Sequence, residues 1–144
     1  KASTPTMRPQ QSLGIEKFWG SFRREEHCLE YILRHRFHSL CPRCGNRRLY
    51  RLRSRRAFSC SNCHRQFYPL ANTILAKSTN SITLWFFAMF LLIQSRGSVS
   101  AKELERHLGV TYKTAWRMRR QIIQLAKSAE WKRGLSILVL VRRL

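Results

Sequence analysis

The first half of the chain combines a helical pattern with a short alternating one. Between residues 15 and 36 apolar side chains recur every three or four positions, which predicts a helix interrupted near Gly20. Residues 39–70 are rich in turn-forming residues and alternate between polar and apolar positions, which predicts short strands. Residues 1–14 are polar and include two prolines, so we expect a loose leader ahead of the helix.

The second half predicts three helices with short connections. Residues 82–95 are apolar on almost every side, which is typical of a helix buried in a core. A homodimer interface on the second face of this helix is the alternative. Residues 100–108 begin with the capping pattern Ser-x-x-Glu and end before Gly109. Residues 111–127 follow as an amphipathic helix, with Ala115, Met118, Ile122 and Ala126 on its apolar side.

Four of the five cysteines are spaced as two C-x2-C pairs with fifteen residues between them: Cys41, Cys44, Cys60 and Cys63. Two residues between thiols allow a tight turn to direct both sulfurs at one ion, and zinc takes four ligands in a tetrahedron. A hairpin between the pairs would bring the second turn over the first. We therefore predict one structural zinc ion held by all four cysteines, with no coordination position left for a substrate.

Other interpretations of these cysteines explain fewer of them. Disulfides require an oxidising compartment, and a redox C-x-x-C begins a helix in a βαβ unit. The run from Cys60 to His64 has the c-type haem attachment pattern, but it leaves the first pair without a role and requires export. The single Cys28, on the N-terminal helix, is expected to be a small buried apolar residue.

The charge balance indicates a polyanionic partner. The chain has 28 Lys and Arg against 7 acids, a formal charge of +21. Nucleic acid is the commonest such partner, and an anionic membrane is the rival. The longest apolar run, residues 84–93, is too short to span a bilayer, so we expect no membrane insertion. Residues 39–68 hold eight arginines and no acid, which concentrates the charge on the cysteine segment.

The last predicted helix carries basic residues opposite its apolar side, and two helices joined by a turn with glycine suit helix-turn-helix geometry. We therefore predict double-stranded DNA as the partner, with phosphates held by the ribbon and base edges read by the helix. The predicted DNA-binding residues are Arg43, Arg47, Arg48, Arg53, Arg55 and Arg56 on the ribbon, and Tyr112, Lys113, Thr114, Arg117, Arg120, Gln121 and Gln124 on the helix.

These elements predict a mainly α fold with a small zinc-ribbon β element. The expected divisions are a leader and N-terminal helix at 1–38, a zinc ribbon at 39–70, a three-helix helix-turn-helix unit at 71–128 and a tail at 129–144.

In the order and spacing of several motifs, the chain resembles insertion-sequence transposases with an N-terminal zinc ribbon, which are relatives of the Merlin-type elements. The resemblance covers roughly residues 22–126 and rests on Glu25-Glu26-His27-Cys28, Arg36-Phe37, both cysteine pairs, Asn72-Thr73-Ile74, Leu84-Trp85 and the run 100–118. Asn72 stands where the family usually has glycine, and asparagine tolerates the left-handed backbone. The resemblance implies that the ribbon and helix-turn-helix recognise the terminal inverted repeats of the element.

The resemblance also implies a following RNase H-like domain that cleaves and joins strands with two metal ions. Two-metal phosphoryl transfer needs several converging carboxylates. The chain has no Asp, and Glu130 is the only acid beyond the last predicted helix. We therefore expect the catalytic domain to be missing, the tail 129–144 to be its truncated or degenerate start, and the chain not to be an enzyme.

A stand-alone regulator, or a module that binds RNA or protein, is the alternative function. Aromatic side chains exposed on the ribbon, with Tyr50 and Tyr68 as candidates, would favour single-stranded nucleic acid through stacking. A DNA-binding role implies the nucleoid in the cytoplasm of a bacterium or the nucleus of a eukaryote.

Overall fold

The computed structural model describes residues 9–127 and confirms a mainly α fold with a small β element. The elements are α1 (Pro9–Ser21), α2 (Glu25–Phe37), β1 (Leu49–Leu52), β2 (Ala57–Cys60), β3 (Gln66–Phe67), α3 (Ile82–Gln94), α4 (Ala101–Leu108) and α5 (Tyr112–Lys127). The predicted tail at 129–144 lies outside the described residues.

The N-terminal region is more helical than the sequence predicted. The expected leader is wrong from Pro9 onward, because α1 begins there. Proline is tolerated in the first turn of a helix, where its missing N–H would have no helical partner. The predicted interruption is confirmed, since α1 ends at Ser21 and α2 starts at Glu25.

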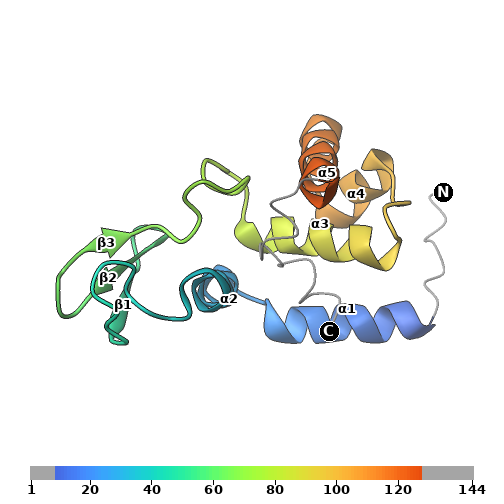
Figure 1. Cartoon of the computed structure of the whole chain (residues 1–144). Coiled ribbons are helices and arrows are strands. Elements are labelled where there is room, and N and C mark those ends of the chain that lie inside the picture. The colour runs from blue at the N-terminus through green and yellow to red at the C-terminus, as the bar shows by residue number, and fades with distance from the viewer. Residues whose placement is uncertain (1–8, 128–144) are drawn as a thin grey trace.

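α3 is the centre of the fold and lies between α1 on one side and α4 and α5 on the other (Figure 1). Ten of its 13 residues are buried, which explains why it is apolar on nearly all sides. Phe18 of α1 packs against Phe87 and Phe90 with ring centroids 5.4 and 5.1 Å apart. α1 and α2 thus cover the face that the sequence left open for a homodimer, so a homodimer would need another surface.

α4 and α5 pack against each other and against α3, and a short turn joins them. The predicted capping box is confirmed: Ser100 N–H donates to Glu103 Oε2 at 2.7 Å, and Glu103 N–H donates to Ser100 Oγ at 3.2 Å. Gly109 ends α4 with φ +66°, a left-handed conformation that glycine adopts without strain. The apolar side of α5 is shorter than predicted, because Ala126 is exposed and the last buried residue is Ile122.

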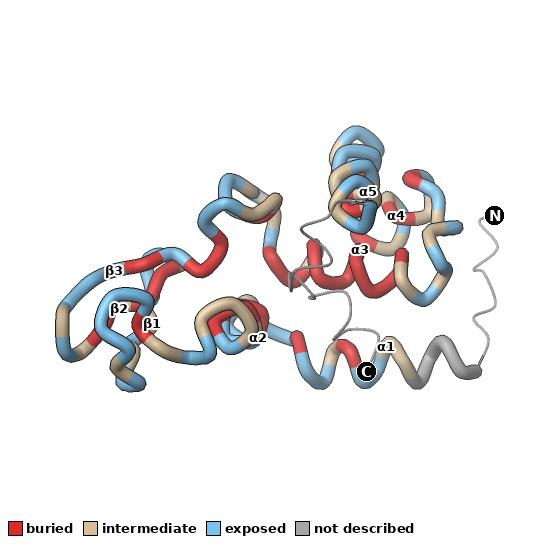
Figure 2. The backbone as a smooth tube through the Cα atoms, viewed as in Figure 1, coloured by how far each residue is buried: buried red, intermediate tan, exposed pale blue. Residues whose placement is uncertain are grey.

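The three strands form an antiparallel sheet in the order β1-β2-β3. Phe58 pairs with Phe67 in register, and Phe67 meets Phe37 of α2 with centroids 5.4 Å apart. Figure 2 shows buried residues running along α3, whereas the ribbon carries mostly exposed and intermediate ones. Such a small sheet buries too little apolar surface to fold by itself, so it needs the metal site or a neighbour. Among the described helices, none combines the length and apolar character needed to cross a bilayer.

Candidate metal centre and basic surfaces

The four predicted ligands meet at one point beside the sheet. Their sulfurs all lie within 4.8 Å of one another. Cys41 Sγ is 3.6 Å from Cys63 Sγ, and Cys44 Sγ is 3.5 Å from Cys60 Sγ. A tetrahedral zinc with Zn–S bonds of about 2.3 Å sets its sulfurs about 3.8 Å apart. The cluster therefore fits one zinc ion, as predicted.

Two copies of the same turn build this cluster. In the first, Gly45 N–H donates to Cys41 O at 2.9 Å, and in the second His64 N–H donates to Cys60 O at 3.1 Å. The residue after each second cysteine is left-handed, with φ +75° at Gly45 and +60° at His64. Within each turn a backbone N–H, from Arg43 or Asn62, donates to the first sulfur at 3.4 Å. The turns thus aim both sulfurs inward and supply donors that stabilise thiolates.

The electrostatics of the cluster favour a bound cation. The N–H groups of Cys63 and Asn62 lower the pKa of Cys60 to about 6. The N–H of Arg65 likewise lowers the pKa of Cys63, but burial and the neighbouring sulfurs outweigh it and raise that pKa to about 11. Four thiolates this close repel one another, and a divalent cation compensates their charge. With four sulfur ligands the site is closed, which is typical of structural zinc.

The structure also places the remaining cysteine and the histidine of the haem-like pattern. His64 is an exposed turn residue, and the pair that precedes it shares its site with Cys41 and Cys44. Cys28 is fully buried on α2, and desolvation raises the pKa of its thiol to about 12. The prediction that Cys28 serves as a small buried apolar residue is confirmed.

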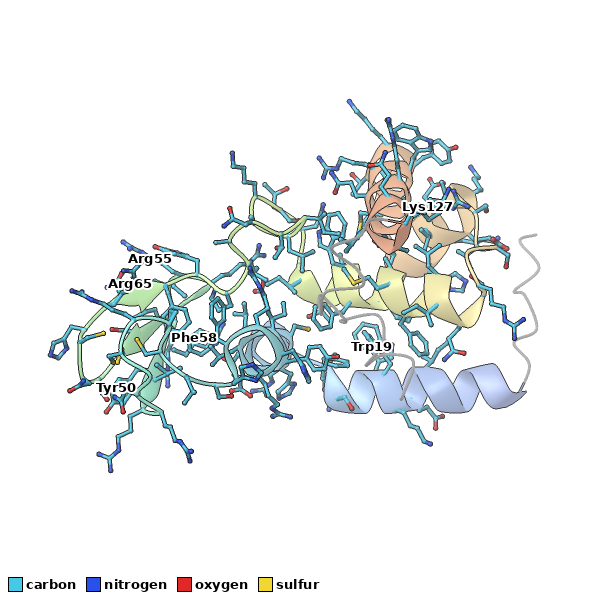
Figure 3. The ribbon with its side chains drawn as sticks, viewed as in Figure 1. Trp19, Tyr50, Arg55, Phe58, Arg65 and Lys127 are labelled. Carbon is cyan, nitrogen blue, oxygen red and sulfur yellow. The ribbon has the colours of Figure 1, made fainter. Side chains whose placement is uncertain are left out.

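The sheet has an inner face toward α2 and an outer face toward solvent. Tyr50 pairs with Ser59, which pairs with Gln66, so these three share the outer face. Tyr50 is 61% exposed. Figure 3 shows Arg55 and Arg65 at one side of the ribbon and Tyr50 at the other. Arg65 is also exposed, but it is not among the predicted DNA-binding residues. It belongs to the same arginine-rich segment, residues 39–68, on which that prediction was based.

Five of the six predicted ribbon arginines have exposed side chains: Arg43, Arg47, Arg48, Arg53 and Arg55. Arg56 differs from them because its guanidinium binds within the chain. Its Nε lies 2.6 Å from Glu25 Oε1, its Nη1 donates to Ser78 O at 2.8 Å and its Nη2 donates to Asn80 O at 3.1 Å. Arg56 therefore joins the ribbon to α2 and to the segment that leads into α3.

The outward face of α5 carries most of the predicted helix contacts. Tyr112, Lys113, Arg117, Arg120 and Gln124 are exposed, whereas Thr114 and Gln121 are half-buried. Arg119 lies apart from this face, since its Nε donates to Val99 O at 2.8 Å and its Nη2 to Gly97 O at 3.2 Å.

Trp116 is the residue of this face that the sequence analysis did not assign to DNA. Its side chain is 47% exposed, and the guanidinium of Arg120 lies 5.3 Å from its ring centroid. Helical spacing predicts this exposure, because Trp116 stands about 100° from Ala115 and about 160° from Met118 around the helix axis.

Comparison with curated proteins and with solved structures found no match. Comparison with protein families found one: residues 23–66 match the model of the transposase zinc-ribbon domain. The matched segment includes α2, β1, β2, the first residue of β3 and all four cysteines. This part of the chain is therefore similar to the zinc-ribbon domains of transposases.

Proposed function

We propose that residues 9–127 form a zinc-stabilised DNA-binding module of a transposase, which recognises the terminal inverted repeats of its element. The observation that carries the proposal is that a transposase-type ribbon packs, through one continuous core, with a helix pair whose outer face is basic. The core supports this as a single module, because it includes Phe58 and Phe67 of the ribbon as well as Met118 and Ile122 of α5.

The ribbon supplies the phosphate contacts. Its five exposed predicted arginines and Arg65 have no ion-pair partner among the described residues, so their charge is directed at solvent. Arginine suits phosphate because its planar fork donates two parallel hydrogen bonds. Such contacts position a duplex without reading its sequence. Because Arg56 is bound within the chain, we leave it out of the proposed contacts.

α5 supplies the base contacts as the second helix of a helix-turn-helix. α4 packs against it, while its face with Lys113, Arg117 and Arg120 stays exposed. A helix of this diameter fits the major groove, where arginine and lysine bond to guanine and glutamine bonds to adenine. The N-terminal turns of such a helix reach the bases.

We propose further that this module binds without catalysing strand transfer. The four cysteines are the one group of His, Cys, Asp and Glu residues in the described part that could hold a metal ion. The glutamates of the described part form no group that could share an ion. Four of them instead have partners within the chain: Glu25 pairs with Arg56, Glu26 with Arg51, Glu103 with the Ser100 N–H, and Glu105 with Lys102. Two-metal chemistry would need carboxylates that share ions.

The decisive experiment is selection of the zinc-loaded chain on a pool of random duplex DNA, repeated with Arg117→Ala across a range of salt. The proposal predicts an enriched motif whose preference is lost in the variant. Binding without a motif, declining with salt in proportion to the phosphates contacted, would leave only non-specific attraction. Metal-dependent nicking of the DNA would contradict the binding-only role.

Binding of single-stranded nucleic acid is the second candidate, and two exposed aromatic residues favour it. Tyr50 is 61% exposed on the outer face of the sheet and Tyr68 is 46% exposed just after β3. Aromatic rings stack on unpaired bases with little sequence preference. Competition between a single strand and its duplex distinguishes the two functions, and Tyr50→Ala would weaken binding only if the single strand is the ligand.

A further inference from the structure

Trp116 is a large apolar side chain exposed in the middle of a basic helix face. About half of its surface is in contact with solvent, at 47% exposure. The residue one turn before it, Tyr112, is 50% exposed. α5 packs into the core through Ala115, Met118 and Ile122, and Trp116 belongs neither to this core nor to the partly buried residues packed against it. Two exposed aromatic rings one turn apart on a basic helix face offer a ligand both apolar contact area and positive charge.

Arg120 gives the exposed tryptophan a specific chemistry. Its guanidinium lies over the indole ring, 5.3 Å from the centroid, which is the geometry of a cation–π contact. α5 contains no acid that could compete for this guanidinium. The stacked arginine therefore loses part of its rotamer freedom before any ligand binds, which lowers the entropic cost of making directed hydrogen bonds.

A ligand for these two side chains must place an apolar group against the indole and two hydrogen-bond acceptors beside the guanidinium. Both groups must be accessible to a helix. Lys113 and Arg117, exposed on the same face, require that this ligand also be anionic. In duplex DNA the base edges are polar with one exception, the 5-methyl group of thymine, which projects into the major groove. Guanine presents its O6 and N7 acceptors in the same groove and binds arginine through both.

We propose that Trp116 and Arg120 act together as a specificity-determining pair that selects a thymine next to a guanine. The indole of Trp116 covers the thymine methyl group, and the guanidinium stacked on it donates two hydrogen bonds to the neighbouring guanine. This inference rests on the proposed function, because it requires α5 to lie in the major groove. The inference adds to that function the identity of two neighbouring bases that α5 selects.

The test uses two random duplex pools, one containing thymine and one containing uracil in its place, which lacks the 5-methyl group. With the zinc-loaded full chain, we expect a motif containing the thymine–guanine step, and about fourfold weaker binding when that thymine is replaced by uracil. The factor is the equivalent of about 0.8 kcal/mol for one buried carbon. Trp116→Ala should bind both versions equally. Lys77→Ala, which removes an exposed side chain outside the ribbon and outside α5, is the control and should keep the difference.

Arg120→Lys tests the second half of the pair. Lysine keeps the charge but loses the planar fork, so the guanine preference should fall while overall affinity at low salt is nearly unchanged. Thermal melting of each variant checks that the fold is intact, which we expect because both side chains are exposed.

The outcomes separate this inference from the proposed function. A motif that binds equally with thymine and uracil, or one that Trp116→Ala leaves unchanged, overturns the inference while the DNA-binding function stands. If neither pool yields a motif, sequence-specific binding itself fails. If Trp116→Ala changes the sedimentation of the protein without changing base preference, the tryptophan contacts a second copy of the chain and the inference is wrong.

Discussion

Replacing Arg56 by alanine should destabilise the protein without removing a DNA contact. Its guanidinium donates to the carbonyl oxygens of Ser78 and Asn80 and lies 2.6 Å from Glu25. Hydrogen bonds from charged groups contribute about 1.5–3 kcal/mol each when buried. The side chains of Arg56 and Glu25 are 29% and 33% exposed, so the ion pair adds only about 0.2–1 kcal/mol, and each of the two partly buried hydrogen bonds contributes about 1 kcal/mol, below the range for fully buried ones. We expect a loss of about 2–3 kcal/mol.

Thermal denaturation with bound zinc measures this loss. For a domain of this size, the midpoint should fall by roughly 6–12 °C. Arg55→Ala is the matched control, because Arg55 is the preceding residue and its side chain is exposed. That variant should melt within about 0.5 kcal/mol of the parent, as is usual for surface substitutions. It should instead lower the slope of log affinity against log salt by about 0.9, the loss of one phosphate contact.

Arg56→Lys sharpens the comparison. A phosphate contact tolerates lysine, which remains a cation, whereas an ammonium group cannot replace the two hydrogen bonds and the ion pair that one planar guanidinium makes. We expect Arg56→Lys to be nearly as unstable as Arg56→Ala. If Arg56→Ala instead melted like the parent protein and its salt slope showed the loss of one phosphate contact, Arg56 would face the DNA and its structural role would be excluded.

Three further predictions concern the metal site and the helix cap. Chelation of zinc, or Cys60→Ser, should unfold the sheet while most helical signal in far-UV circular dichroism persists, because α3–α5 have a core without metal; complete loss of helix would contradict this. His64→Gly should slow zinc loss to a chelator, because the left-handed strain it relieves, about 1–2 kcal/mol, exceeds the roughly 0.4–1 kcal/mol that a flexible glycine costs. Gly45→Ala should speed zinc loss for the converse reason, although a Cβ there meets no atom within 4 Å. The Ser100 N–H lowers the pKa of Glu103, so its carboxylate stabilises the fold above its ordinary pKa and loses that effect as the pH falls through the lowered value. Glu103→Ala should therefore cost about 0.5–1 kcal/mol at pH 7 and less at pH 3, as measured by thermal melting.

Local chemistry made most of the fold predictable. The capping box and Gly109 fixed the limits of α4, because both act through bonds to their own backbone. Asn72 does adopt the left-handed backbone that its place in the motif required, with φ +62°. Where the prediction failed, tertiary packing decided: Gly14 belongs to α1, and a Cβ added there would lie 3.3 Å from Phe90 Cζ of α3, a proximity that no local pattern encodes.

The zinc ligands could be predicted from the sequence, whereas the roles of the ribbon arginines could be predicted only in part. The cysteine spacing specifies a tetrahedral site through the geometry of two short turns. Neighbouring arginines, by contrast, have the same local sequence signal, and only the fold reveals that Arg55 faces solvent while Arg56 binds three partners. Trp116 is absent from the predicted DNA-binding residues, although its angular position on the helix lies away from Ala115 and Met118.

α2 connects the ribbon to the helical core, which explains why the family match begins at residue 23 rather than at the first cysteine. On one side, Arg36 donates to Pro69 O and Ala71 O at 2.6 and 2.8 Å. On the other side, Tyr31 meets Phe86 of α3 with ring centroids 5.8 Å apart. The same helix thus packs against both the ribbon and the helical core. In the proposed complex with DNA, a phosphate contact through the ribbon would restrict where α5 meets the bases, and the sequence-independent part of the surface would contribute to specificity by setting the register.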